Sequence, residues 1–359
     1  MGLQFVVEPT ATPTSADALA EILAAPGFGK HFTDHMATAT WTADDGWHDA
    51  RIRPYGPLQL DPATHVFHYG QTIFEGFKAY HQPDGTIATF RPAANGERFV
   101  RSAARMALPA LPVEDFVTAA DLLIRQDAAW VPTDPETSLY LRPFMIATEV
   151  GLGVRPASEV TFLVIASPAA SYFGAVVRPV TIWLSEDYSR AAPGGTGAAK
   201  CGGNYAASLV AQQEAIANGC DQVVFLDAVE RRWVEELGGM NIFFVLDDGT
   251  LVTPELTGSI LEGVTRDTVL TIAKELGHEV EERRVDVDEW RKGAETGRIT
   301  EVFACGTAAV VTSLGSLRWR GGEVTMPAEM PVAQRVRDTL VGIQHGLLPD
   351  PHGWLHRVP

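Results

Sequence analysis

Strand-like and helix-like segments are mixed along this chain without strict alternation, and this order restricts the fold more than any other feature. The segments "MATATWTA" and "WHDARIRP" alternate like antiparallel strands, and "FKAYHQPDGTIATF" is typical of a hairpin that turns at Pro83–Gly85. Two helical patterns follow in "ANGERFVRSAARMAL" and "VEDFVTAADLLIRQDAAW", before the strand patterns "SLYLRPFMIA" and "VTFLVIA". A doubly wound sheet needs regular alternation, so the order predicts the α+β class.

The second half of the chain predicts a further set of mixed elements. Strands are expected in "VTIWLS", "QVVFLD", "MNIFFVLDDGTLVT" and "TEVFACG", and helices in "YAASLVAQQEAIANG", "TRDTVLTIAKELG", "VDEWRKGAETG" and near "VAQRVRDTLVGIQHG". A chain of 359 residues is long for one core. We therefore expect a smaller N-terminal α/β domain over 1–167, an interdomain loop over 168–176 that is rich in Ala, Ser and Gly, and a larger C-terminal α/β domain over 177–359.

Composition excludes several classes of partner. Lys and Arg number 28 against 45 Asp and Glu, a net charge of −17 that argues against nucleic acid and anionic membranes. The three cysteines have no CxxC spacing, which favours a reducing compartment. The start "MGLQFVVEPT" lacks a basic region and a cleavage site, and Pro168 and Gly174 interrupt the longest apolar run. The sequence predicts a soluble, cytoplasmic protein.

The stretch "GGTGAAKCGGNYAAS" surrounds one amine, that of Lys200, with small residues. It fails the phosphate-loop motif because Ala199 precedes the lysine and Cys201 follows it, and it lacks the third glycine of the dinucleotide fingerprint. Taken alone, such a lysine is more often a solvated turn residue. Small neighbours would also let it form a Schiff base with a bound carbonyl, as lysines do with pyridoxal phosphate. That cofactor requires phosphate donors, a partner for the ring nitrogen, a donor for the phenolic oxygen and apolar walls.

Several motifs decide between these readings. Together with "YGQTIFEGFKAY", "WVEELGGMNIFFV", "SILEGVTRD" and "FACGTAAVV", the stretch "KCGGNYAAS" resembles the branched-chain aminotransferases of the fold-type IV pyridoxal phosphate family. The resemblance runs from about Phe28 to about Met326, with the motifs in order. It implies the two-domain fold of that family, a homodimer and the cofactor pyridoxal 5′-phosphate. The implied reaction is transamination of L-leucine, L-isoleucine and L-valine with 2-oxoglutarate.

The resemblance also implies roles for residues around the cofactor. Lys200 matches the Schiff-base lysine, and Tyr205 matches the tyrosine bonded to the phenolic oxygen. Adjacent residues of a strand face opposite sides, so only one of Glu235 and Glu236 can face the ring nitrogen. The family's spacing to "GGMN" favours Glu236. The residues that match phosphate-binding positions are Arg98, whose planar fork suits this task, Val264 and Thr265 at a helix start, and Thr307.

A substrate pocket is implied in the same way. Its apolar positions are matched by Phe28, Tyr69, Phe74, Tyr140, Val154 and Tyr172, with Tyr69 and Val154 expected from the partner subunit. The backbone at Thr307 and Ala308 matches the place of the substrate α-carboxylate. Arg142 and Lys78 are the cations available to glutamate's second carboxylate, and Arg142 is our first candidate.

This chain departs from some members of the family at a few positions, and three alternative functions have to be weighed against the branched-chain aminotransferase. Ala309 and Thr312 occupy positions where some family members carry a redox CxxC, and Gly239 replaces a threonine of some relatives. A D-amino-acid aminotransferase and an aminodeoxychorismate lyase of the same fold are the nearest rivals, and the chain length and "GTAA" favour the branched-chain enzyme. A binding protein without chemistry is a further alternative, against which Lys200, Tyr205 and Glu236 together argue. No metal site is expected, since His65 and His68 lack further ligands at suitable spacing.

Overall fold

The computed structural model describes residues 2–134, 136–170 and 179–359, and the chain divides into two units. The first unit comprises Met1–Ala175, Ala199–Gly202 and Ile343–Pro359, and the second comprises Val176–Ala198 and Gly203–Gly342. Residues 199–202 therefore group with the first unit although second-unit residues flank them in the sequence. The predicted interdomain loop, 168–176, lies mostly outside the described residues, and Tyr172 lies outside them as well.

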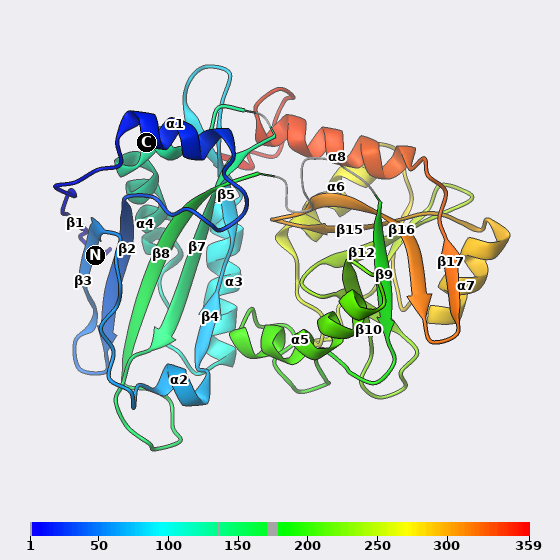
Figure 1. The fold of residues 1–359 in the computed structure, drawn as a ribbon, viewed down its shortest axis with the longest axis horizontal. Coiled ribbons are helices and arrows are strands. Elements are labelled where there is room, and N and C mark those ends of the chain that lie inside the picture. The colour runs from blue at the N-terminus through cyan, green and yellow to red at the C-terminus, as the bar shows by residue number, and fades with distance from the viewer. Residues whose placement is uncertain (1, 135, 171–178) are drawn as a thin grey trace. The chain divides into compact units, whose positions relative to one another are not determined.

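A nine-stranded, almost entirely antiparallel sheet forms the first unit (Figure 1). Its strand order is β1-β3-β2-β8-β7-β5-β6-β18, with β4 paired to β7, and only β1 and β3 run parallel among these pairs. The strands are β1 (Val6–Val7), β2 (His35–Thr42), β3 (Gly46–Pro54), β4 (Thr72–Phe74), β5 (Phe77–His81), β6 (Ile87–Phe90), β7 (Ser138–Ala147), β8 (Glu159–Ala169) and β18 (Leu355–Arg357).

Helices α3 (Pro92–Arg105) and α4 (Val113–Gln126) supply the core of the first unit. They pack on each other, and α4 also packs on β2, β3 and β8. Phe99 and Phe116 from the helices meet Phe162 of the sheet, with ring centroids 5.3 to 6.2 Å apart. Two shorter helices, α1 (Ala16–Ala24) and α2 (His65–Tyr69), complete this unit.

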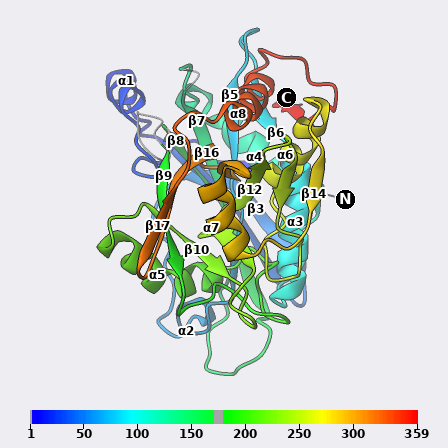
Figure 2. The ribbon, with the colours of Figure 1, turned by 90° about the vertical axis from the view of Figure 1, so that its right-hand side faces the viewer.

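The second unit has its own nine-stranded sheet, of mixed direction (Figure 2). Its order is β11-β10-β9-β16-β15-β12-β13-β14, with β17 paired to β16. The strands are β9 (Val180–Ser185), β10 (Gln222–Leu226), β11 (Val234–Leu237), β12 (Asn241–Leu246), β13 (Leu251–Thr253), β14 (Val280–Glu282), β15 (Ile299–Gly306), β16 (Val310–Trp319) and β17 (Gly322–Thr325). Helices α6 (Val264–Glu275) and α7 (Val287–Thr296) pack on β15, while α5 (Gly202–Ala217) and α8 (Pro331–Gln344) each span the division between the units.

The predicted elements are largely confirmed, and the α+β class with them. Strands β7 and β9 match the predicted segments residue for residue. The helix expected over "VEDFVTAADLLIRQDAAW" ends earlier, at Gln126, and a 3₁₀ turn, Ala128–Trp130, follows it. The sequence reading missed α1 and the long strand β16, which contains Gly315. Among the described residues, no helix has both the length and the apolar character needed to cross a bilayer.

Candidate active site

The segment around Lys200 is fixed to the first unit through its backbone. The Lys200 N–H donates to Ser102 Oγ at 3.0 Å, and the Lys200 carbonyl accepts from the Phe74 N–H at 2.9 Å. Cys201 forms an antiparallel bridge with Ile73. The Lys200 amine, Nζ, lies 4.7 Å from the centre of the Phe74 ring. The backbone of the lysine loop thus pairs with β4, and this pairing explains why residues 199–202 group with the first unit.

Other atoms closely approach two glycines on either side of Lys200, and at Gly197 the approach requires glycine. A Cβ on Gly197 would lie 2.1 Å from the Ser259 carbonyl oxygen, which cannot move without its backbone. A Cβ on Gly202 would come within 3.1 Å of the Thr72 side chain. The small residues that marked Lys200 in the sequence therefore serve packing of the loop on both sides of the lysine.

Arg98, the predicted phosphate arginine, is buried on α3 and paired with Glu75. Its Nε lies 2.7 Å from Glu75 Oε1 and its Nη2 lies 2.8 Å from Oε2, while Asn95 Nδ2 donates to the same Oε2 at 2.8 Å. Burial acts to raise the pKa of Glu75, but the charge and hydrogen bonds of Arg98, with a further contribution from Lys200, lower it below its usual value. Sequence reasoning missed Glu75, although it stands in the quoted "TIFEG" motif.

Four residues of the predicted substrate pocket meet in the first unit. The rings of Phe28 and Tyr140 are in edge contact, with centroids 5.2 Å apart. The Arg142 guanidinium lies 4.9 Å from the Phe74 ring centre and donates to the Tyr140 hydroxyl at 3.2 Å. A Cβ on Gly76 would lie 1.9 Å from that hydroxyl, so only glycine leaves Tyr140 its place.

The other predicted pocket residues of the first unit have different surroundings. Tyr69 on α2 is 41% exposed and its hydroxyl donates to the Leu152 carbonyl at 2.5 Å. Val154 is 86% exposed. Lys78, the alternative cation, is buried in β5 and pairs in register with Tyr140 of β7. Phe28, Phe74, Tyr140 and Arg142 thus form one cluster, whereas Tyr69 and Val154 face solvent.

Glu236 in the second unit is held by an arginine that the sequence gave no reason to select. Arg190 Nη2 lies 2.9 Å from Glu236 Oε1, and both side chains are almost fully buried. The same guanidinium donates to the carbonyls of Ser259 at 3.0 Å and Gly197 at 3.3 Å, and the Leu261 N–H donates to Glu236 Oε2 at 3.2 Å. Arg190 therefore connects β11 to the loop that leads to Lys200. Nothing in its local sequence distinguishes it from other loop arginines.

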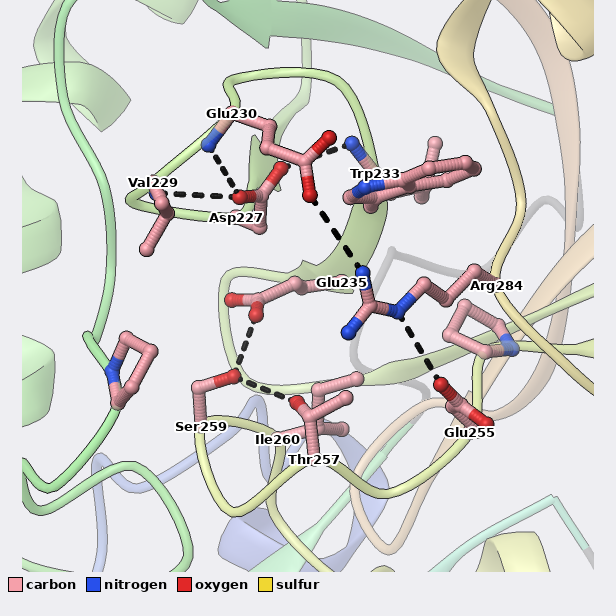
Figure 3. A pocket seen from close by; sticks show the side chains of 13 residues that line it. Asp227, Val229, Glu230, Trp233, Glu235, Glu255, Thr257, Ser259, Ile260 and Arg284 are labelled. Atoms are coloured by element: carbon pink, nitrogen blue, oxygen red, sulfur yellow. Dashed lines mark hydrogen bonds and ion pairs between the residues drawn. The ribbon is translucent and has the colours of Figure 1, made fainter.

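Glu235, the rival carboxylate, has a different environment (Figure 3). It accepts a hydrogen bond from Ser259 Oγ, and burial raises its pKa. It lines a cavity of about 200 Å³ in which Arg284 pairs with Glu230 and Glu255. Glu236 is not among the residues that line this cavity. The two adjacent carboxylates thus differ in partner and in surroundings, as expected for residues on opposite faces of a strand.

The residues of the second unit that are predicted to bind the cofactor phosphate, Val264 and Thr265, lie at the start of a helix. Helix α6 begins at Val264, and Gly263 at its N-cap has no side chain to satisfy the first backbone N–H groups. Asn241 Nδ2 donates to the Leu261 carbonyl at 3.0 Å, and a Cβ on Gly263 would collide with Asn241 Oδ1 at 2.0 Å. Such a helix start attracts anions.

Tyr205, Thr307 and Ala308 occupy other parts of the second unit. Tyr205 lies on α5 with its ring beside Gly239, where a Cβ would come within 3.0 Å of Tyr205 Cε1. The glycine that departs from some relatives thus makes room for this tyrosine. Thr307 and Ala308 form the turn between β15 and β16, which pair as far as Gly306 and Val310.

Comparison with known proteins decides the family. The sequence pattern of the family described as Amino-transferase class IV matches residues 72–317. This chain belongs to the class IV aminotransferases. It is 60% identical to a probable branched-chain-amino-acid aminotransferase of Streptomyces coelicolor over 98% of each chain, and 56% identical to a branched-chain-amino-acid aminotransferase of Mycolicibacterium smegmatis over 99% of this chain and 98% of that one.

Solved structures agree with this assignment. The branched-chain amino acid aminotransferase of Escherichia coli is 30% identical, with a TM-score of 0.75 over 90% of this chain and 100% of that one. That of Thermobaculum terrenum, solved in its PLP form, is 26% identical, with a TM-score of 0.72 over 89% of this chain and 98% of that one. The predicted resemblance to branched-chain aminotransferases and the predicted fold are therefore confirmed.

The cysteines of this class IV aminotransferase are all buried and unpaired. Burial raises the pKa of Cys305 to about 12, so its thiol is protonated at neutral pH. Ala309 and Thr312 stand in the turn and strand that follow it. We therefore expect no thiol switch at this turn.

Proposed function

We propose that this protein transfers the amino group of L-leucine, L-isoleucine and L-valine to 2-oxoglutarate, giving branched 2-oxo acids and L-glutamate. Relatives that carry the name branched-chain-amino-acid aminotransferase and are 54% to 60% identical support this proposal. The structural observation that carries it is the position of the Lys200 amine beside Phe74. The same ring contacts Arg142, and Arg142 joins it to Tyr140 and Phe28.

The side chains fit pyridoxal 5′-phosphate as the cofactor. Lys200 offers the amine that attaches an aldehyde, and Glu236 offers a carboxylate for a ring nitrogen. Arg98 and the uncapped start of α6 at Val264 and Thr265 offer a cation and backbone N–H groups for a phosphate, with Thr307 as a further donor. When bound, this cofactor supplies an electron sink for the charge that develops at the substrate Cα.

The residues of this chain then divide the remaining work. Lys200 Nζ would take the proton from the substrate Cα and pass it to the cofactor's aldehyde carbon, and in the second half of the reaction it would carry a proton in the opposite direction. Arg190 orients Glu236 and balances its charge, because the two charged groups are buried 2.9 Å apart. Tyr205 is our donor for the phenolic oxygen.

Substrate selection rests on one apolar wall and a few polar groups. Phe28, Phe74 and Tyr140, with Tyr172, bury a branched aliphatic side chain. The N–H groups of Thr307 and Ala308 receive the α-carboxylate. Glutamate brings a second carboxylate that costs several kcal/mol to bury unpaired, so a cation must receive it. Arg142 is our candidate because its buried Nε has no hydrogen-bond partner among the described residues, and Lys78 is the alternative.

We propose a homodimer, which the surroundings of two predicted pocket residues support. Tyr69 and Val154 are 41% and 86% exposed. We propose that in the dimer they complete the pocket of the partner subunit. The reduced cysteines and the strongly negative charge support a cytoplasmic location.

A substrate panel tests the proposed reaction. Purified protein loaded with pyridoxal 5′-phosphate should convert L-leucine, L-isoleucine and L-valine with 2-oxoglutarate, and should leave D-alanine and aminodeoxychorismate unchanged. Lys200→Ala should abolish the activity, while Lys274→Ala, which removes an exposed lysine of α6, should retain it. Activity on D-alanine would favour the D-amino-acid aminotransferase, and pyruvate released from aminodeoxychorismate would favour the lyase. Failure to bind the cofactor would favour a binding protein without chemistry.

A further inference from the structure

One buried carboxylate stands among several cations in the first unit. Glu75 is fully buried, and its two oxygens face the fork of Arg98 at 2.7 and 2.8 Å. The next residue toward the N-terminus, Phe74, has the Lys200 amine and the Arg142 guanidinium on its ring, at 4.7 and 4.9 Å. We propose that Glu75 is a positioning residue for this site: it holds Arg98 in place and supplies the negative charge that balances the cations around the Lys200 amine.

One face of helix α3 holds both Glu75 and the segment that contains Lys200. Asn95, Arg98 and Ser102 are spaced by three and four residues, which places them along the same side of the helix, and all three are buried. Asn95 and Arg98 bind Glu75, whereas Ser102 accepts the hydrogen bond from the Lys200 N–H. The helix therefore fixes the carboxylate and the lysine segment to each other.

The backbone gives a second connection between Glu75 and Lys200. The Phe74 N–H donates to the Lys200 carbonyl, and the adjacent Glu75 N–H donates to the Pro143 carbonyl at 2.7 Å. Glu75 also accepts from its neighbour's N–H, that of Gly76, at 3.2 Å. A carboxylate with this many fixed donors cannot turn away from the site, so its charge acts from a constant position.

The charges around the Lys200 amine determine whether loss of Glu75 makes a nitrogen at this position bind protons more readily or less readily. In the first unit the groups that face it or its neighbours are Glu75 from the β4–β5 connection, Arg98 from α3, and Arg142 with the Tyr140 hydroxyl from β7. The interaction is mutual, since the charge of Lys200 helps to lower the pKa of Glu75. Neutral glutamine in place of Glu75 would leave the cations uncompensated, and protons would bind less readily to any amine or imine nitrogen at Lys200. Loss of Arg98 alone would have the opposite effect.

This inference rests on the proposed role of Lys200, and the test uses the protein loaded with pyridoxal 5′-phosphate. The visible absorbance of the bound cofactor is titrated with pH in the wild type, E75Q, R98Q and the double variant E75Q/R98Q. We expect the midpoint to fall by about 1 pH unit in E75Q and to rise in R98Q, as one charge at short range shifts a protonation equilibrium by this order. The double variant should titrate near the wild type, because both members of the pair are neutral.

Two further comparisons make the outcome unambiguous. D127N is the matched control: Asp127 is a buried carboxylate of the same unit, and its ion-pair partner among the described residues is His35, at 2.6 Å. Its midpoint should match that of the wild type. If E75Q does not fold, R98Q and the double variant still differ only at Glu75, and the double variant must titrate lower than R98Q by about 1 pH unit.

A second measurement separates this inference from the proposed function. Borohydride reduction of each loaded variant, followed by peptide mapping, shows whether the cofactor is attached to Lys200. Attachment elsewhere would contradict the proposed function itself. Attachment to Lys200 with equal midpoints in R98Q and the double variant would overturn only the role of Glu75, as would E75Q and R98Q moving in the same direction.

Discussion

The described residues of each unit include a deeply buried arginine–glutamate pair, and the two pairs have opposite arrangements. In the first unit Arg98 is proposed to face the cofactor and Glu75 supports it, at 2.7 Å. In the second unit Glu236 is proposed to face the cofactor and Arg190 supports it, at 2.9 Å. In both cases the sequence selected the member that is proposed to face the ligand and missed its support. A buried charge needs a partner, and only tertiary structure shows which residue supplies it.

The pairs also differ in what holds the supporting residue. Glu75 is bound by Arg98, Asn95 and the Gly76 N–H, all from residues near it in the sequence or on one helix. Arg190 binds two backbone carbonyls in addition to Glu236, and these belong to the lysine loop and to the loop before α6. The second pair therefore organises more of its surroundings than the first.

The largest expected effect is on the second pair. Arg190→Met leaves Glu236 as a buried carboxylate without its cation and deprives the carbonyls of Ser259 and Gly197 of a donor. The free energy of unfolding should fall by about 3–5 kcal/mol, as when one member of a buried pair is removed. Urea unfolding followed by fluorescence measures it. Arg284→Met, which removes a half-exposed arginine near the same loop, should cost little; equal losses in the two variants would mean that Arg190 organises nothing special.

A second variant tests the arginine that lies on the Phe74 ring of the first unit. Arg142→Gln should reduce kcat/KM for glutamate by about 1.5–3 kcal/mol, the value of a charged hydrogen bond, because the distal carboxylate loses its partner. Leucine should lose much less, since it has no charge at that position. Steady-state kinetics with both substrates measures the difference, and Lys78→Gln is the parallel variant for the alternative cation. Equal losses on both substrates would place Arg142 at the α-carboxylate or in the scaffold.

A smaller effect distinguishes two buried carboxylates, Glu235 of β11 and Glu75 of the first unit, by the direction in which the pKa of each is shifted. Burial raises the pKa of Glu235 in the folded protein, so its ionised form opposes folding at neutral pH, and this penalty disappears once the pH falls below the ordinary glutamate value of about 4.3. Glu235→Gln should therefore stabilise the protein slightly at pH 7 and not at pH 4. Glu75 has the opposite sign: its lowered pKa stabilises the fold at neutral pH, and that stability is lost as the pH falls through the folded value. Thermal unfolding at both pH values checks Glu235, and a loss at pH 7 would show that its bond to Ser259 matters more than its desolvation.

The smallest expected effect is a null result in the turn between β15 and β16. In a variant that lacks Cys201 and Cys220, mild peroxide should not cause inactivation that dithiothreitol reverses, because the pKa of Cys305 is raised to about 12. Activity before and after treatment measures it. Reversible loss of most activity would mean that Cys305 becomes accessible in solution.

The sequence predicted most of the elements, although it missed α1 and β16, and it selected candidate site residues where a family motif supplied the spacing. Strand period and turn residues located β7, β9 and the β5–β6 hairpin, and the motifs located Lys200, Glu236 and Arg98. Spacing could not reveal Glu75 or Arg190, because their partners lie 23 and 46 positions away. The position of Gly239 beside Tyr205 was equally hidden, because it depends on the packing of α5 against the β11–β12 turn.

The grouping of Lys200 with the first unit follows from tertiary contacts as well. The sequence places the lysine between β9 and α5, which both belong mainly to the second unit. Its backbone nevertheless bonds to Ser102 and Phe74. The lysine proposed to carry the cofactor is thus anchored beside Glu75 and Arg98, whereas the carboxylate proposed to face the ring nitrogen belongs to the other unit.

The central claim is that Lys200 carries the cofactor, and one measurement tests it directly. The loaded protein is reduced with borohydride, digested and mapped by mass spectrometry. We expect a pyridoxyl group on the peptide that contains Lys200 and none on peptides that contain Lys30, Lys78, Lys274 or Lys292. A label on any of those four, with Lys200 unmodified, would contradict it.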